Sequence, residues 1–358
     1  MPRKKRITES GKWIKNAVYL VAYLLSFILY PLPSSCVPKL QKIVGHTSQQ
    51  EQLKGDLEQG NIAHAYLFSG PRHLGKMPLA LQFAYELLST DVEEQQRPEM
   101  LSQFERLTHP DLLVLDQLWM EEVCDDWGEI AKTSNVPQKH RAKAPAAKTD
   151  IISINDIRAL QERLMDTGTG TYRCCIIRSV ERMKDAAANA FLKILEEPPE
   201  GLIFLLTTQH QSSLLPTIVS RTRVLPFRRV ARKDLTILLE GVPEDDQKFM
   251  LHIVSGAPGM VVRLRNDPDL LRLHRTVHTT AQSFWQTQSL RERLQILSPL
   301  HKRGKESDDL LLHLGLTLRE QPAATLCKNA PAFAQLTADF QTNAHRQLLS
   351  QKFVLGIV

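Results

Sequence analysis

The sequence lacks the paired cysteines from which structural zinc sites and disulfide frameworks are built. It has five cysteines in 358 residues, and no two of them are spaced as Cys-x-x-Cys. Structural zinc sites in proteins usually draw on such pairs. Cys174 and Cys175 lie inside an apolar run, which is typical of core residues. The composition therefore predicts no zinc, and the missing disulfide framework fits a reducing compartment.

A large excess of charge of one sign is also missing. The net charge is +6, with 23% charged and 42% hydrophobic residues. A moderately basic chain is compatible with acidic partners such as nucleic acid, but it names no contact residue. The length permits two or three domains.

Long apolar runs are rare, and the clearest one lies near the N-terminus. Residues 17–32 read AVYLVAYLLSFILYPL and follow a basic start. This run is shorter than the roughly 20 residues that a membrane span needs, and a basic start before an apolar segment also occurs in signal peptides. Three interpretations stay open for the extension 1–40: an unused upstream start, a membrane-associating segment or a secretion signal. The rest of the chain reads as cytoplasmic, so we expect no membrane partner.

Strands and helices are predicted to alternate between residues 41 and 227. Apolar runs predict strands at 65–70, 109–116, 171–180, 202–208 and 223–227, and helical periodicity predicts helices at 48–60, 77–88, 151–164 and 185–197. Continuous apolar strands favour a parallel sheet that is covered on both faces, hence the α/β class. Ser153 followed by Asp156 predicts a capping box. Residues 117–149 read as a loop or insertion that is partly disordered.

The chain changes character after residue 228. Helical patterns continue to the C-terminus, with breaks near residues 256–260 and at Asp267-Pro268. We therefore expect a small helical domain at 228–267 and an all-α domain at 268–358.

A Gly-rich turn between the first predicted strand and its helix has the spacing of a phosphate-binding loop. Gly70, Gly75 and Lys76 fit the pattern G-x-x-x-x-G-K. In such a loop the backbone N–H groups and the helix N-terminus face an anion, and the lysine reaches the outer phosphates. Met77 follows, where a serine or threonine hydroxyl normally ligates Mg²⁺, and a thioether is a poor ligand for that ion. Two interpretations stay open for this loop: it binds ATP or ADP passively, or it is a Gly-rich turn that binds no ligand.

The second half of the metal site lacks its ligands as well. A P-loop ATPase needs carboxylates at the end of another core strand to hold Mg²⁺ and to activate water. Here the apolar run that ends at Ile177 is followed by Arg178 and Ser179, and a cation at this point repels the metal. Together with Met77, these degenerate positions predict that the chain does not hydrolyse ATP.

Several segments, in order, resemble the clamp-loader subunits of bacterial DNA polymerase III, which are AAA+ proteins, and most closely the delta-prime family. The similar segments are IVGHTSQQEQL (43–53), HPDLLVLD (109–116), ERMKDAAANAFLKILEEPPEGLIFLLTT (181–208), LLPTIVSRTRVLPF (214–227) and SGAPGMVVRL (255–264). The resemblance implies an AAA+-type P-loop NTPase domain at 41–227. It also implies a helical lid at 228–267 and an oligomerising helical collar at 268–358.

The resemblance further implies a role. Such a subunit belongs to a hetero-pentamer with motor (gamma/tau) subunits and a delta subunit, which places the sliding clamp on primed DNA. Ser220-Arg221-Thr222 is similar to the family's Ser-Arg-Cys motif, so Arg221 is the expected arginine finger for a neighbour's ATP site. Gly259 stands where motor subunits keep a sensing arginine, and residues 89–108 lack the cysteines of the family's zinc module. Two alternatives are an ATP-hydrolysing AAA+ motor subunit and a membrane-anchored structural protein.

Overall fold

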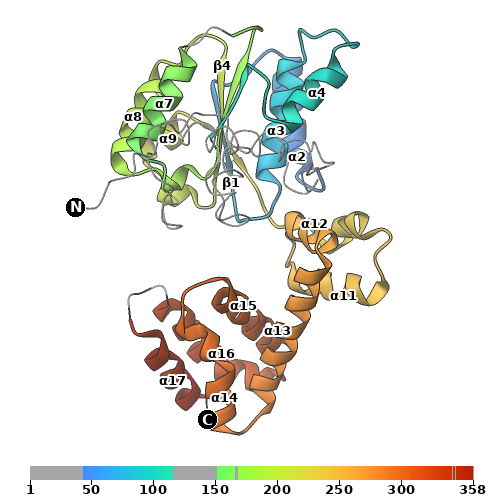
Figure 1. The fold of residues 1–358 in the computed structure, drawn as a ribbon, viewed down its shortest axis with the longest axis vertical. Coiled ribbons are helices and arrows are strands. Elements are labelled where there is room, and N and C mark those ends of the chain that lie inside the picture. The colour runs from blue at the N-terminus through green and yellow to red at the C-terminus, as the bar shows by residue number, and fades with distance from the viewer. Residues whose placement is uncertain (1–42, 116–150, 166–167, 341, 343, 358) are drawn as a thin grey trace, which may run out of the picture. The chain divides into compact units, whose positions relative to one another are not determined.

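The computed structural model describes residues 43–115, 151–165, 168–340, 342 and 344–357 (Figure 1). The predicted N-terminal extension and the insertion at 117–149 lie outside these residues. The described chain forms two compact units. One contains residues from 80 to 206, and the other contains 43–79 together with the chain from 207 onward.

Five strands form one sheet in the order β2-β3-β4-β1-β5. The strands are β1 (Ala65–Ser69), β2 (Leu112–Leu115), β3 (Arg173–Ile177), β4 (Leu202–Thr208) and β5 (Arg223–Pro226). The pairs β2–β3, β3–β4 and β1–β5 are parallel, with Leu67 opposite Val224 in the last of them. Every residue of β4 is buried, as expected for a strand with helices over both faces. The predicted α/β fold with a parallel sheet is confirmed.

Helices lie on both sides of the strands of the first unit. Helices α7 (Ile154–Leu164) and α8 (Asp185–Glu196) lie on one side, and α3 (Lys76–Leu88) and α4 (Arg97–Glu105) lie on the other (Figure 1). The predicted capping box begins α7. The Ser153 hydroxyl accepts the Asp156 N–H at 3.4 Å, and the Asp156 carboxylate accepts the Ser153 N–H at 2.8 Å. Cys174 and Cys175 are fully buried in β3, and burial raises the pKa of both thiols, so neither is reactive.

After β5, every described element is a helix. The first group is α10 (Arg232–Leu235), the 3₁₀ turn η3 (Thr236–Leu239), α11 (Glu244–Ile253) and α12 (Pro258–Asn266). The second is α13 (Pro268–Gln286), α14 (Leu290–Ile296), η4 (Ser298–His301), α15 (Lys305–Arg319), α16 (Ala323–Asp339) and α17 (Arg346–Gly356). Each group packs around its own buried cluster, one including Leu235 and Val261, the other including Phe284 and Leu314.

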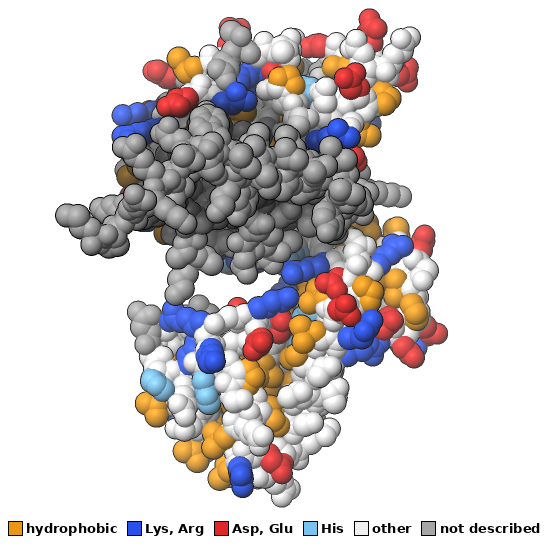
Figure 2. Space-filling model, viewed as in Figure 1, with side chains coloured by type: hydrophobic (Ala, Val, Ile, Leu, Met, Phe, Trp, Pro, Cys, Tyr) orange, Lys and Arg blue, Asp and Glu red, His pale blue; other side chains and the backbone are white. Residues whose placement is uncertain are grey.

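The predicted breaks coincide with the starts of α12 and α13. Asp267 caps α13, because its carboxylate accepts the Leu270 N–H at 2.9 Å. Acidic, basic and hydrophobic side chains are interspersed on the visible face of these helices (Figure 2). Among the described helices, none has the length and apolar character needed to cross a membrane.

Candidate functional site

The predicted phosphate-binding loop connects β1 to α3. Gly70 and Gly75 have φ values of +152° and +87°. A Cβ atom at Gly70 would lie 2.4 Å from the carbonyl oxygen of Phe227, so the close approach of these two backbone segments requires glycine. The strand–turn–helix context that the sequence predicted is therefore present.

The side chain of Lys76 folds back onto its own loop. Its ammonium group donates hydrogen bonds to the carbonyl oxygens of Gly70 and Pro71, the second at 2.6 Å. These two carbonyl oxygens thus accept N–H groups of Lys76 that could otherwise donate to a phosphate. A bound nucleotide would have to draw Lys76 away from these carbonyls.

The first turn of α12 contacts the same loop. The Gly259 N–H donates to the His73 carbonyl at 2.8 Å, and His73 itself adopts a left-handed conformation with φ 59°. A Cβ atom at Gly259 would lie 2.9 Å from the His73 oxygen. Any larger residue at this position, arginine included, would require the two backbones to separate, so the close contact explains the glycine physically.

His46, at the start of α2 (Thr47–Glu58), is a neighbour of the loop that the sequence analysis missed. Its ring centroid lies 4.5 Å from that of Phe227. Burial lowers its pKa, and the charge of Lys76 acts in the same direction, so the ring is neutral at neutral pH. The sequence did contain one indication of His46, because a histidine directly after Gly45 comes just before the predicted helix that precedes the loop.

The positions expected to hold Mg²⁺ carry other groups. Met77 is the second residue of α3, and Arg178 directly follows β3, where its N–H donates to the Leu115 carbonyl at 3.1 Å. Ser179 is buried with φ 56°. A thioether, a guanidinium and a hydroxyl do not make the oxygen-rich anionic site that Mg²⁺ prefers. These residues do not fit the metal.

Arg221 lies between the short helix α9 (Pro216–Ser220) and β5, which is an edge strand of the sheet. Its guanidinium donates to the Thr217 carbonyl at 3.0 Å, and the Thr222 hydroxyl donates to the Val219 carbonyl at 3.0 Å. Ser220 donates to Thr217 in the same turn. The side chains of the motif thus donate to carbonyls of the last turn of α9, and the chain continues directly into β5.

A buried polar network fixes the strand that follows Arg221. The Arg223 guanidinium lies 2.5 Å from the Asp56 carboxylate, which also accepts the Tyr66 hydroxyl at 2.9 Å. Burial, the largest cause, raises the pKa of Tyr66 to about 12. This network links β5, β1 and α2, and it was missed because its members lie far apart in the sequence.

The chain is similar to several known proteins. The family described as "DNA polymerase III, delta subunit" matches residues 45–231. The gamma/tau subunit of DNA polymerase III from Mycobacterium tuberculosis is 32% identical over 225 residues, which are 60% of this chain and 34% of that protein. The delta' subunit from Bacillus subtilis is 27% identical over 220 residues, which are 60% of this chain and 58% of the relative.

Two further proteins are similar to this chain. The delta' subunit from Pseudomonas aeruginosa is 29% identical over 216 residues, 56% of each chain. A solved gamma-subunit-related protein from Thermotoga maritima covers 86% of this chain and 98% of its own, with a TM-score of 0.47 and 17% identity. The chain spans about a third of the gamma/tau relatives and just over half of the delta' relatives.

Proposed function

Because the chain belongs to the DNA polymerase III delta-subunit family, within the clamp-loader subunits, we propose that it acts as a non-hydrolysing delta-prime subunit. In this role it supports loading of the sliding clamp onto primed DNA and supplies an arginine to a neighbouring motor subunit. Its partners are the gamma/tau and delta subunits of a hetero-pentamer, and it reaches the clamp and DNA through that complex.

The observation that carries the proposal is the loss of both halves of the metal site. Met77 stands at the hydroxyl position, and Arg178 with Ser179 stand at the carboxylate positions. Phosphoryl transfer in P-loop enzymes depends on Mg²⁺ to neutralise charge on the phosphates. The engagement of Lys76 by loop carbonyls agrees with a loop that has no hydrolytic duty. No cofactor is required, and passive binding of ATP or ADP is compatible with the two glycines and Lys76.

Arg221 is the residue that such a subunit would offer to its neighbour. A guanidinium is planar and permanently charged, so it matches phosphoryl oxygens on which charge develops. Its position at a tight helix–strand junction beside the Asp56–Arg223 pair limits backbone motion. A group that must reach a transition state in another subunit gains from such a rigid support.

The proposal is tested with a reconstituted loader. Arg221→Ala is expected to leave assembly intact and to lower the ATPase rate that the clamp and primed DNA stimulate in the motor subunits. Arg221→Lys is expected to restore little, because an ammonium lacks the bidentate fork. Arg272→Ala, which alters an exposed arginine on α13, is the matched control. An unchanged stimulated rate in Arg221→Ala would remove this residue from the mechanism.

A motor subunit is the second candidate function, because the gamma/tau relatives match over as much of the chain as the Bacillus delta' relative does. It requires hydrolysis by the purified chain alone. We expect no hydrolysis above background, and no further fall with Lys76→Ala. A rate that Lys76→Ala abolishes would establish the motor function instead.

We propose a cytoplasmic location. The competing membrane-anchored function rests on residues 17–32, which lie outside the described residues. Mass spectrometry of the N-terminus of the native protein decides between them, because a mature chain that begins near residue 40 contains no anchor.

A further inference from the structure

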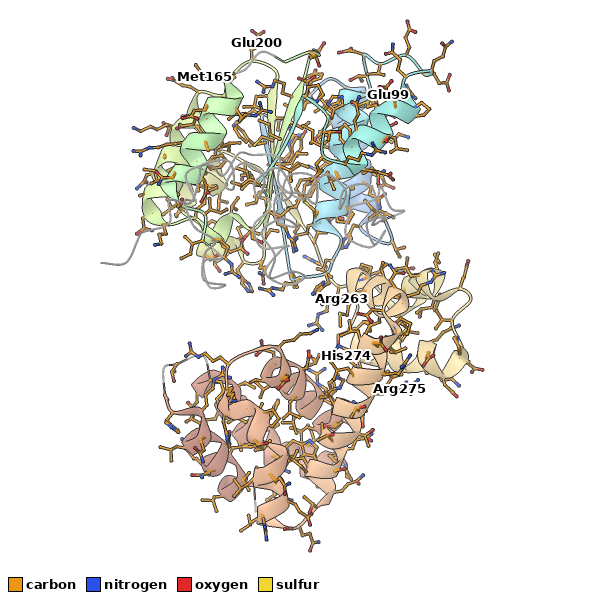
Figure 3. All side chains as sticks on the ribbon, viewed as in Figure 1. Glu99, Met165, Glu200, Arg263, His274 and Arg275 are labelled. Carbon is orange, nitrogen blue, oxygen red and sulfur yellow. The ribbon has the colours of Figure 1, made fainter. Side chains whose placement is uncertain are left out.

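Five titratable side chains meet in the helical part of the second unit. His252 belongs to α11, His274 and His278 lie one turn apart on α13, His313 belongs to α15, and Glu320 follows α15 directly. His274 is labelled on α13 in Figure 3. Three separate stretches of chain contribute to this set, so no local sequence pattern indicates it.

Three of these side chains have the geometry of a metal-ligand set. One ligand atom each from His252, His278 and Glu320 lie within 4.8 Å of one another. Nε2 of His252 lies 2.8 Å, and Nε2 of His278 lies 3.4 Å, from Oε1 of Glu320. Ligand atoms of a tetrahedral zinc ion are about 3.4 Å apart, given bonds of about 2.1 Å. The His278–Glu320 distance already matches this spacing, and the His252–Glu320 pair would have to open by about 0.6 Å. The ligand atoms of His252 and His278, at most 4.8 Å apart, would have to come to about 3.4 Å.

The nitrogen of His252 that faces this centre has no hydrogen bond. Nε2 is buried, yet it makes none with the carboxylate 2.8 Å away. The distance alone would allow a hydrogen bond, so it is the angle at the ring nitrogen that prevents one. A buried polar nitrogen without a partner is costly, and a cation between it and Glu320 would remove that cost.

The other face of His278 is held by two further histidines. Its Nδ1 lies 3.2 Å from Nδ1 of His313, whose Nε2 lies 2.9 Å from Nδ1 of His274. The amide nitrogen of Gln282 lies 3.4 Å from Nε2 of His278 and donates to Oε2 of Glu320 at 3.2 Å. A metal on Nε2 of His278 would require the lone pair there and the N–H on Nδ1. The N–H groups then follow one direction along the chain of rings, from His278 to His313 to His274. All three rings are neutral in this arrangement.

This arrangement is the one that a ligating histidine requires. A metal-bound imidazole uses its lone pair on one nitrogen and donates from the other, and the partner of that donor fixes the ring. His313 thus acts as a positioning residue for His278, and His274 completes the chain.

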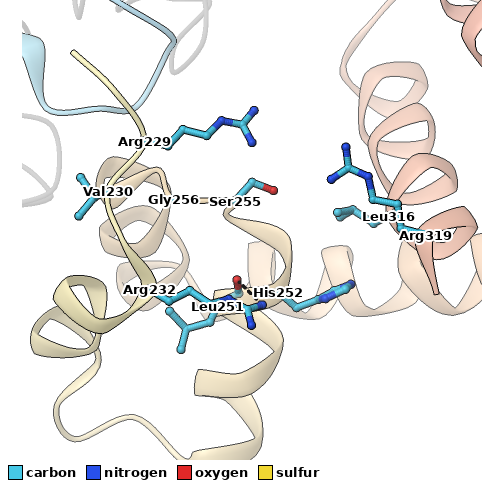
Figure 4. A pocket seen from close by; sticks show the side chains of 9 residues that line it. All are labelled: Arg229, Val230, Arg232, Leu251, His252, Ser255, Gly256, Leu316 and Arg319. Carbon is cyan, nitrogen blue, oxygen red and sulfur yellow. Dashed lines mark hydrogen bonds between the residues drawn. The ribbon is translucent and has the colours of Figure 1, made fainter. Parts of the chain in front are cut away.

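The surroundings indicate which cation fits. Arg229, Arg232 and Arg319 line a pocket of about 390 Å³ beside His252, and in Figure 4 the side chains of Arg229 and Arg319 point toward the same opening. These positive charges oppose a cation that is held by charge alone, as Ca²⁺ and Mg²⁺ are. A metal bound through imidazole nitrogens depends less on charge, which favours zinc. Side-chain exposures of 34% for His252 and 33% for Glu320 leave room for entry and for a water ligand.

We propose that His252, His278 and Glu320 form a zinc site with water as the fourth ligand. The ion would join α11 to α13 and to the end of α15, so it would lock the two helical groups of this unit to each other. The site takes no part in phosphoryl transfer, and the proposal stands independently of the proposed function.

The test is zinc binding by the full-length chain. After chelator treatment and dialysis, the protein is titrated with Zn²⁺ alone, and bound metal is counted by emission spectrometry. We expect the parent to bind one equivalent of zinc. His252→Gln and Glu320→Gln should each lower the affinity for zinc by at least about tenfold. His210→Gln, which alters an exposed histidine outside the cluster, is the matched control and should bind as the parent does. Equal binding by the parent and both variants, or no binding by the parent, overturns the proposal.

A second measurement does not depend on the variants folding. Co²⁺ replaces Zn²⁺ in tetrahedral sites and reports its ligands by absorption. A site of two imidazoles, a carboxylate and water gives visible d–d bands without a thiolate charge-transfer band. A thiolate band in the parent protein would assign the ion to cysteine and would contradict the proposal. Zn²⁺ should also raise the melting temperature of the parent by a few degrees and leave that of Glu320→Gln unchanged.

Discussion

Lys76 combines a feature that the sequence predicts with one that only the structure shows. The lysine is present at the expected position, but its ammonium group is bound by carbonyls of the same loop. Met77, next to it, supplies no oxygen ligand. The sequence predicts the missing Mg²⁺ ligand at Met77, whereas the hydrogen bonds of Lys76 to its own loop are visible only in the structure. The same holds for Gly259, whose contact with the His73 carbonyl no sequence pattern indicates.

His109 gives a pH-dependent prediction at the same scale. Its neutral ring accepts the Asp111 N–H at Nδ1, at 3.2 Å, and burial lowers its pKa below 6.5. Below pH 6.5 the unfolded chain therefore binds a proton that the folded chain does not. The stabilisation is complete above that pH and is lost as the pH falls toward the folded-state pKa.

Asparagine can accept the same backbone N–H without titrating. We expect His109→Asn to reduce the loss of unfolding free energy between about pH 7 and pH 5 by on the order of 1 kcal/mol. Urea unfolding of the parent and the variant at both pH values measures this change in unfolding free energy. Parallel losses in the parent and the variant would show that His109 does not contribute.

Helix α7 shows what local sequence determines at the scale of one element. Its capping box was predicted from Ser153 and Asp156 alone, because the interaction spans three residues. Helix α4 was not predicted, since its sequence has weak helical periodicity and only Met100 and Phe104 are buried. The Asp56–Arg223 pair and the histidine cluster were also missed, because only the fold brings their segments together.

The cap of α7 can be tested directly. Ser153→Ala removes the hydroxyl that accepts the Asp156 N–H, and we expect it to lower the unfolding free energy by about 1 kcal/mol. Ser283→Ala, which removes an exposed hydroxyl inside α13, should change it by less than about 0.5 kcal/mol. Chemical denaturation monitored by circular dichroism compares the two. Equal effects would mean that the capping box adds nothing.

At the scale of the whole molecule, an α/β fold precedes a helical C-terminal part, and a family match covers residues 45–231. The parallel sheet and the helical C-terminal part were predictable, because apolar runs and helical periodicity are local signals. The role in an assembly is not visible in one chain. Arg221 lies at a tight helix–strand junction, and under our proposal the phosphates that it contacts belong to another subunit.

The most direct measurement is therefore single-turnover ATP hydrolysis in an assembled loader in which only the motor site facing this chain remains functional. Our account predicts that Arg221→Ala slows this step by roughly 10³-fold or more, as expected for loss of an arginine finger, while ATP binding and assembly persist. The Arg272→Ala control should hydrolyse ATP at the parental rate. A single-turnover rate that Arg221→Ala leaves unchanged would contradict the account.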